Sequence, residues 1–195
     1  MSSSNPIAVL VSGGGRSLEN LVDEIAAGRL DAEVRVVVSD RPGAFALERA
    51  AKHGIEALVL DRREFDSHEA YSKAVFAELE ARGVKLVVLA GFLRLLLLQP
   101  GWGGRVVNIH PALLLAFGGK GFYGDHVHRA VLTRGVQVTG CTVHYVDDEY
   151  DNGKVILQRW IPVPQGIDVD GLAALVFEEE KLALPEAIRR HFAQA

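Results

Sequence analysis

An asparagine and a histidine stand two residues apart in the stretch Val106-Val107-Asn108-Ile109-His110-Pro111. The surrounding apolar residues predict a buried strand, which Pro111 ends because proline cannot continue the hydrogen-bonded ladder. Since side chains alternate along a strand, Asn108 and His110 share one face. Both side chains donate hydrogen bonds, and an imidazole also moves protons. The hexapeptide alone is nevertheless more typical of a satisfied polar pair at a strand end.

A glycine-rich segment, Ser12 to Ser17, follows the apolar run Ile7 to Val11 and precedes apolar residues at helical spacing. This order predicts a strand, a loop and a helix. Backbone N–H groups at a helix N-terminus attract anions, and Arg16 adds a guanidinium, so a phosphate is the expected ligand. The spacing is neither that of a dinucleotide-binding fingerprint nor that of a Walker A loop. A plain tight turn is the alternative.

Three other polar positions have simpler local explanations. Asp40 precedes a Pro-Gly pair after a predicted strand, so turn hydrogen bonds are expected there rather than ribose binding. Asp151 precedes an Asn-Gly dipeptide and by itself is also typical of a turn. His126 and His128 lie two apart on a predicted helix start without accompanying acids, so no metal site is predicted.

Strand-like and helical patterns alternate along the first half of the chain, which predicts parallel strands with helices on both faces. The predicted strands span residues 7–11, 34–38, 57–60 and 86–90. Ligands of such sheets bind at the carboxyl ends of the strands. We therefore expect three segments to meet at one sheet edge: residues 12–17, 91–95 and 108–110.

The second half of the chain predicts an antiparallel hairpin followed by a helix. Strand-like residues 139–146 and 155–163 flank the Asn-Gly turn, and a helical pattern runs from Asp170. The expected fold class is α/β, with a doubly wound, mostly parallel, Rossmann-like sheet and an antiparallel hairpin near the C-terminal part. Since no linker or repeat interrupts the pattern, we expect a single domain over residues 1–195.

Composition narrows the class of protein further. A net charge of −4 gives no general attraction to nucleic acid or to an anionic membrane. The segment Leu86 to Leu98 is too short and too interrupted to span a bilayer, and Met1 to Pro6 lacks the basic residues that begin a signal peptide. Cys141 is the single cysteine, which excludes an intrachain disulfide. We expect a cytoplasmic protein, as a monomer or homodimer.

Four blocks of the sequence, taken together, resemble the phosphoribosylglycinamide formyltransferase family of folate-dependent formyltransferases. The resemblance covers nearly the whole chain and keeps the family's order. The blocks are Ser12-Gly-Gly-Gly-Arg-Ser-Leu18, Leu89-Ala-Gly-Phe-Leu-Arg94, Val107-Asn-Ile-His-Pro111 and Gly140-Cys-Thr-Val-His-Tyr-Val-Asp-Asp-Glu-Tyr-Asp-Asn-Gly153.

The resemblance implies transfer of a formyl group from 10-formyltetrahydrofolate to the amine of glycinamide ribonucleotide, in purine biosynthesis, without a metal. It identifies Asn108, His110 and Asp151 as the catalytic residues. Amine attack on a formyl carbon creates an oxyanion, to which the Asn108 amide and a protonated His110 could donate. A neighbouring carboxylate raises the pKa of a histidine, so we expect Asp151 to maintain His110 as an imidazolium.

The resemblance also implies which residues bind the two substrates. Those expected to hold glycinamide ribonucleotide are Gly15, Arg16, Ser17 and Glu180. Those expected to hold the folate are His68, Leu93, Arg94, Leu95, Leu96 and Asn108. Residues 116–125, rich in glycine and carrying three aromatic side chains, are expected to form a mobile lid.

Three alternatives are weighed against this assignment. A formyltetrahydrofolate deformylase would use water in place of the amine, but usually carries an additional amino-terminal domain. Methionyl-tRNA formyltransferase would need a further basic domain for its nucleic acid. A non-catalytic nucleotide-binding module would use the glycine loop alone and would leave Asn108, His110 and Asp151 unexplained.

Overall fold

The structure, a computed structural model, describes residues 4–194 and divides into two compact units, the first ending at Val107 and the second beginning at Asn108. Residues 1–3, part of the segment that lacks a signal-peptide start, lie outside the described residues. The single domain expected over residues 1–195 stays a prediction. None of the helices within residues 4–194 combines the length and the apolar character that a membrane crossing requires.

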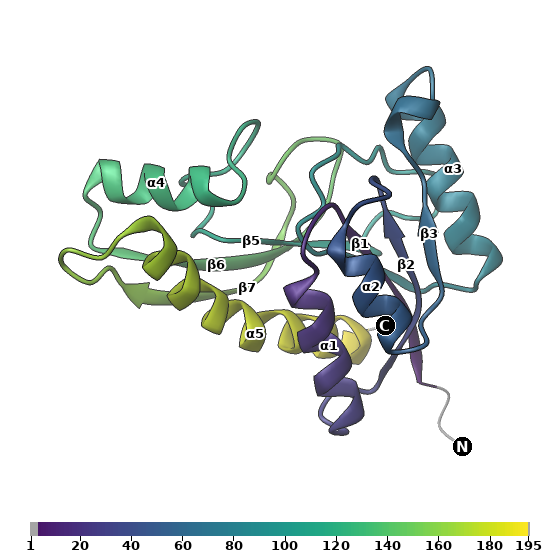
Figure 1. The fold of residues 1–195 in the computed structure, drawn as a ribbon, viewed down its shortest axis with the longest axis horizontal. Coiled ribbons are helices and arrows are strands. Elements are labelled where there is room, and N and C mark those ends of the chain that lie inside the picture. The colour runs from purple at the N-terminus through teal and green to yellow at the C-terminus, as the bar shows by residue number, and fades with distance from the viewer. Residues whose placement is uncertain (1–3, 195) are drawn as a thin grey trace. The chain divides into compact units, whose positions relative to one another are not determined.

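The first unit is built on parallel strands, as expected. Its strands are β1 (Asn5–Val11), β2 (Ala32–Ser39), β3 (Ala57–Val59) and β4 (Leu86–Leu89). The order β3-β2-β1-β4, followed by the start of β5, reverses direction at β1 (Figure 1). The pairs β1–β2, β1–β4 and β2–β3 are all parallel. The reversal next to β1 is the kind of switch point at which α/β sheets bind ligands.

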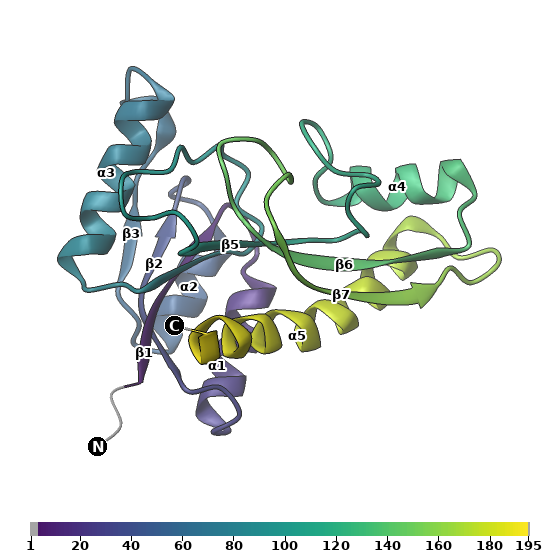
Figure 2. The same ribbon diagram turned by 180° about the vertical axis from the view of Figure 1, so that it is seen from behind.

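Helices join these strands by crossover connections. They are α1 (Arg16–Ala26), α2 (Phe45–Lys52), the 3₁₀ turn η1 (Arg62–Glu64) and α3 (His68–Ala81). Right-handed crossovers put α1 and α2 on one face of the strands and α3 on the other (Figures 1 and 2). The side chains of β4 and most of β1 are fully buried between these layers, which explains their continuous apolar sequence.

The N-terminus of α3 corrects one expectation. Asp66 stands three residues before Glu69 in the sequence, a spacing that predicts a capping box with Asp66 as the N-cap. In the structure the N-cap is Ser67, whose Oγ accepts a hydrogen bond from the backbone N–H of Ala70 at 3.0 Å. Ser and Asp are both good N-caps, so a sequence that offers both in succession leaves the first residue of the helix open by one position.

The second unit holds the end of β5 (Val106–His110), then β6 (Val138–Tyr145) and β7 (Val155–Pro162), with α4 (Asp125–Arg134) and α5 (Val169–Gln194). The order in this unit is β5-β6-β7, and β6 and β7 pair antiparallel, so the predicted hairpin is confirmed. Helix α5 packs against β6 and β7 and also contacts α4. The expected α/β class, mostly parallel with a late antiparallel hairpin, is confirmed.

The connection between β6 and β7 differs from a tight Asn-Gly turn. Asp147 forms the turn: its carboxylate accepts from the backbone N–H of Glu149 at 3.0 Å and from Nδ2 of Asn152 at 2.9 Å. Asp151 is in the left-handed region with φ of 55°. Gly153 passes so close to the carbonyl of Tyr145 that a Cβ would collide with it. The turn hydrogen bonds of this loop are therefore made by Asp147, and not by Asp151 as expected.

Candidate active site

Asn108 and His110 lie on the same face of β5, as the alternation predicts, and a carboxylate from the β6–β7 loop reaches both. Nδ2 of Asn108 donates to Oδ1 of Asp151 at 3.3 Å. Nδ1 of His110 lies 3.5 Å from Oδ2 of Asp151. The imidazole of His110 is 4% exposed and the carboxylate of Asp151 11% exposed, so the pair interacts largely out of water. The structure thus brings together the three residues expected to be catalytic.

His144 is a fourth member of this cluster that the sequence analysis did not single out. It lies on β6, is buried, and its Nδ1 is 2.8 Å from the carbonyl oxygen of Tyr145. Because that carbonyl can only accept, Nδ1 carries the proton, and Nε2 accepts from Nδ2 of Asn108 at 3.1 Å. The alternation of Thr142 and His144 toward one face of β6 is the signal that could have identified it.

The loop expected to form a lid lies directly on these groups. Nε2 of His110 donates to the carbonyl oxygen of Phe117 at 2.8 Å, and the N–H of Gly119 donates to Oδ2 of Asp151 at 2.9 Å. A Cβ at Gly118 would collide with the side chain of Leu114 and lie 3.3 Å from Cβ of Asp151. The loop therefore supplies two backbone contacts to the site, while its mobility stays a prediction.

The protonation of the cluster differs from the expected imidazolium. Burial has the largest effect and lowers the pKa of His110 below its ordinary 6.5, while Asp151 and the Phe117 carbonyl raise it by less. Burial alone would raise the pKa of Asp151, but the imidazoles of His144 and His110 and the N–H of Gly119 outweigh it and leave that pKa lowered. At neutral pH the resting site holds a carboxylate facing a neutral His110, so the expected net upward shift is wrong.

The lowered pKa of His110 predicts how the free energy of unfolding depends on pH. Because the folded pKa of His110 lies below 6.5, the unfolded chain binds its proton first as the pH falls. The contribution of His110 to the free energy of unfolding is therefore fully present above about pH 6.5 and is lost as the pH falls from that value through the lower pKa of the folded protein. We expect the His110 ring to titrate below 6.5 in an NMR titration of labelled protein, and His110→Gln to remove that part of the pH dependence of unfolding. A measured pKa of His110 above 6.5 would contradict this prediction and support the imidazolium expected from the sequence.

The residues expected to hold a phosphate form the start of α1 in the first unit. Gly15 is the N-cap, in the left-handed region with φ of 71°, and a Cβ there would lie 2.6 Å from Cβ of Ala46 on α2. Glycine is therefore required both by the backbone and by the close packing of α2. Arg16 and Ser17 are the first two helical residues, where N–H groups face outward from the helix end.

The residues expected to hold the folate lie in the first unit too. Residues 91–99, which include Leu93 to Leu96, follow β4 without regular structure, and Leu93 is 38% exposed. Its backbone N–H donates to Oγ of Ser12 at 2.9 Å, which ties this segment to the glycine loop. His68 is exposed at the first position of α3.

Arg94 pairs with Asp40, which was expected to form turn hydrogen bonds. Its Nε donates to Oδ2 of Asp40 at 2.6 Å, and the carboxylate of Asp40 is fully buried. The turn hydrogen bonds expected of Asp40 are made instead by Ser39, whose Oγ contacts the backbone of Arg41. The turn interpretation of Asp40 is therefore wrong.

The remaining positions lie in the second unit. Glu180 is half-buried on α5, close enough to Cys141 that its charge, after burial, helps to raise the pKa of that thiol to about 12. His126 and His128 stand at the start of α4, as predicted. Within residues 4–194 no three His, Cys, Asp or Glu side chains are grouped to hold a metal ion.

The buried cluster of amide, imidazole and carboxylate is suited to acyl transfer, in which an oxyanion forms and a proton must move. The chain belongs to the formyl transferase family, which matches residues 5–188. The resemblance found in the sequence blocks is thereby confirmed.

Relatives and solved structures narrow the family. Phosphoribosylglycinamide formyltransferase of Escherichia coli (strain K12) is 39% identical over 186 residues, covering 93% of this chain and 84% of that protein. Trifunctional purine biosynthetic protein adenosine-3 of Gallus gallus is 40% identical over 185 residues, covering 94% of this chain but only 18% of the larger protein. Glycinamide ribonucleotide transformylase 1 from Symbiobacterium toebii superimposes with a TM-score of 0.89 at 41% identity, covering 97% of this chain and 88% of that one.

Proposed function

We propose that this chain transfers the formyl group of 10-formyltetrahydrofolate to the primary amine of glycinamide ribonucleotide. The observation that carries the proposal is the contact of Asp151 with both Asn108 and His110, in a chain similar to named phosphoribosylglycinamide formyltransferases. Both substrates are small molecules, and we propose a cytoplasmic setting, a monomer or homodimer, and no nucleic-acid partner.

The reaction forms a bond between the amine nitrogen and the formyl carbon and breaks the bond from that carbon to N10 of the folate. One proton must pass from the attacking nitrogen to the departing one. Neutral His110 can accept it, because the resulting imidazolium would have an acceptor at each ring nitrogen: the carbonyl of Phe117 and the carboxylate of Asp151. His110 is thus a proton carrier that becomes cationic when the oxyanion is present.

Asn108 supplies a hydrogen-bond donor for the oxyanion. Its amide nitrogen is held by Nε2 of His144 at 3.1 Å and by Asp151 at the longer distance of 3.3 Å. We infer that the formyl oxygen takes over the longer, weaker bond, while His144 keeps the amide in place. Preorganisation of this kind avoids reorientation during the reaction.

The binding assignments are part of the proposal. Gly15, Arg16 and Ser17, at the start of α1, are proposed to hold the phosphate of the ribonucleotide, with Glu180 on its ribose. Backbone groups of Leu93 to Leu96, Arg94 and the exposed His68 are proposed to hold the folate with Asn108. An irregular apolar segment suits a flat ring that needs backbone partners.

The decisive assay incubates the protein with 10-formyltetrahydrofolate, with and without glycinamide ribonucleotide, and follows both folate and ribonucleotide products. We expect formyl loss only when the ribonucleotide is present, with stoichiometric formylated product. Formyl loss that ignores the ribonucleotide would instead identify a deformylase.

Arg16→Ala tests the phosphate assignment. We expect the KM for glycinamide ribonucleotide to rise about tenfold, because a charge-assisted hydrogen bond contributes about 1.5–3 kcal/mol, while kcat changes little. Steady-state kinetics with varied ribonucleotide measure this, and Arg35→Ala, at an exposed arginine of β2 paired with Glu33, is the matched control. An unchanged KM would argue against a phosphate at this position.

A further inference from the structure

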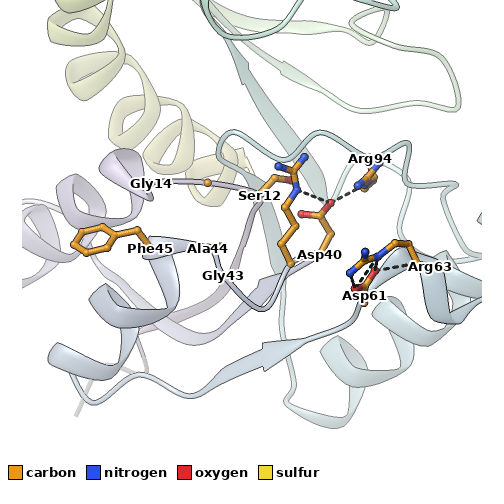
Figure 3. A pocket seen from close by; sticks show the side chains of 11 residues that line it. Ser12, Gly14, Asp40, Gly43, Ala44, Phe45, Asp61, Arg63 and Arg94 are labelled. Carbon is orange, nitrogen blue, oxygen red and sulfur yellow. Dashed lines mark hydrogen bonds and ion pairs between the residues drawn. The ribbon is translucent and has the colours of Figure 1, made fainter.

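A pocket of about 590 Å³ opens in the first unit beside the glycine loop, and Arg94 is the one lining residue that the formyl-transfer proposal also uses (Figure 3). It is lined by the loops that follow β1, β2 and β3, and by Arg94 after β4. Its share of the glycine loop is Ser12 to Gly14, so the proposed phosphate site from Gly15 onward lies outside its lining. A cavity of this volume accommodates a ligand the size of a nucleotide.

The lining of the pocket is cationic. It includes Arg41, Arg63 and Arg94, together with the two carboxylates of Asp40 and Asp61. Arg63 is committed to Asp61 through three hydrogen bonds of 2.6–3.1 Å. Arg41 is held only loosely, 3.7 Å from Asp40, and its side chain is 48% exposed. Three guanidiniums against two carboxylates leave one positive charge in excess, which favours an anionic ligand group.

Asp40, in the middle of the residues drawn in Figure 3, is the most unusual feature of the pocket. Its side chain has no exposed surface, and Oδ2 is bound by Arg94 at 2.6 Å. Its Oδ1, in contrast, has no hydrogen-bond partner among residues 4–194. A buried carboxylate oxygen left unpaired costs free energy, so the site is incomplete without a donor. A hydroxyl group of a ligand would complete it.

One end of the pocket is aromatic. Phe45, the first residue of α2, is 51% exposed and lies in Figure 3 at the end away from Arg63 and Asp61. The guanidinium of Arg49 lies 5.1 Å from the centre of its ring. An exposed aromatic ring backed by a guanidinium is a surface on which a planar base can stack.

We propose that this pocket binds a nucleoside 5′-phosphate. A base, a ribose with its hydroxyls and a phosphate match three features of the pocket: the exposed ring of Phe45, the unpaired oxygen of Asp40 and the arginine side chains. The base stacks on Phe45, a ribose hydroxyl donates to Oδ1 of Asp40, and the phosphate contacts Arg41 and the outer nitrogens of Arg94. This site lies outside the two proposed substrate sites except at Arg94, which the folate assignment also uses.

Isothermal titration calorimetry on the full chain, with neither folate nor glycinamide ribonucleotide present, tests the site. We expect adenosine 5′-monophosphate to bind, and inorganic phosphate, adenosine and 2′,3′-dideoxyadenosine 5′-monophosphate each to bind at least about tenfold more weakly, since each lacks at least one of the three contacts. Phosphate binding as tightly as the nucleotide would reduce the pocket to an anion site and overturn the proposal, as would the absence of nucleotide binding.

Variants locate the bound nucleotide. Phe45→Ala should weaken the nucleotide about tenfold without changing ribose 5-phosphate, and Arg41→Ala should weaken both ligands. Arg16→Ala, outside the pocket, and Arg35→Ala, away from it, should change neither. Nucleotide affinity lost in Arg16→Ala but kept in Phe45→Ala and Arg41→Ala would place the ligand in the proposed substrate site instead. Because no formyl transfer is measured, the outcome is independent of the proposed function.

Discussion

Replacing Asp151 with asparagine is expected to lower kcat by roughly 10²-fold or more while leaving the fold intact. Asparagine keeps the size of the side chain and an oxygen for the N–H of Gly119, 2.9 Å away in the present structure. It removes the negative charge that faces Nδ1 of His110 at 3.5 Å, so the imidazolium formed during proton transfer loses its counter-ion. Steady-state kinetics at saturating concentrations of both substrates, together with a circular dichroism spectrum, measure the two effects.

The pH profile of this variant separates catalysis from simple packing. Asp151 raises the pKa of His110 against the effect of burial, so its charge loss should move the titration of His110 further below 6.5. Asp147→Asn is the matched control, because Asp147 lies in the same loop and makes only turn hydrogen bonds in the structure. Asp151→Asn turnover as high as that of the control would remove Asp151 from the mechanism.

Local sequence patterns predicted the elements better than the roles of individual acids. The strands and helices follow from apolar periodicity, and the shared face of Asn108 and His110 follows from strand alternation. Asp151 and Asp40, however, both looked like turn residues, because each precedes residues that favour turns. In the structure Asp147 and Ser39 form the turn hydrogen bonds, and the two aspartates pair with groups 43 and 54 residues away in the chain. Rules that use only neighbouring residues cannot predict contacts between residues so far apart in the chain.

The protonation of His110 could not be predicted from residue types for a related reason. A neighbouring carboxylate was expected to raise its pKa, and Asp151 does act in that direction. The depth of burial of His110 decides the net direction of its pKa shift. That depth depends on the whole packing around β5, including the loop backbone at Phe117. His144 was overlooked because its importance lies in one contact with Asn108, made across neighbouring strands. Family resemblance supplied Asp151, where local reasoning alone favoured a turn.

Gly153→Ala is expected to damage both stability and turnover. The new methyl group would collide with the carbonyl of Tyr145 at the end of β6, where the N–H of Tyr145 also donates to the carbonyl of Lys154 at 2.9 Å. The atoms that the methyl group would meet, the carbonyl oxygen and carbon of Tyr145, belong to the backbone and cannot rotate away as a side chain could. The ends of the two strands must therefore move apart. We expect a loss of about 2 kcal/mol or more in the free energy of unfolding, and a fall of roughly 5 °C in Tm.

The turnover of this variant tests whether the loop positions Asp151. Asp151 lies two residues before Gly153, so a shift of the loop by about 1 Å would misplace the carboxylate and lower kcat by about 10²-fold in the folded protein. Kinetics well below the Tm, corrected for the folded fraction, measure this. Gly103→Ala, at a glycine with no neighbour within 4 Å of the added Cβ, should leave both quantities nearly unchanged. If Gly153→Ala loses stability but retains full turnover, the close approach of Gly153 to Tyr145 supports the fold only, and the placement of Asp151 must come from its own contacts with Asn108 and Gly119.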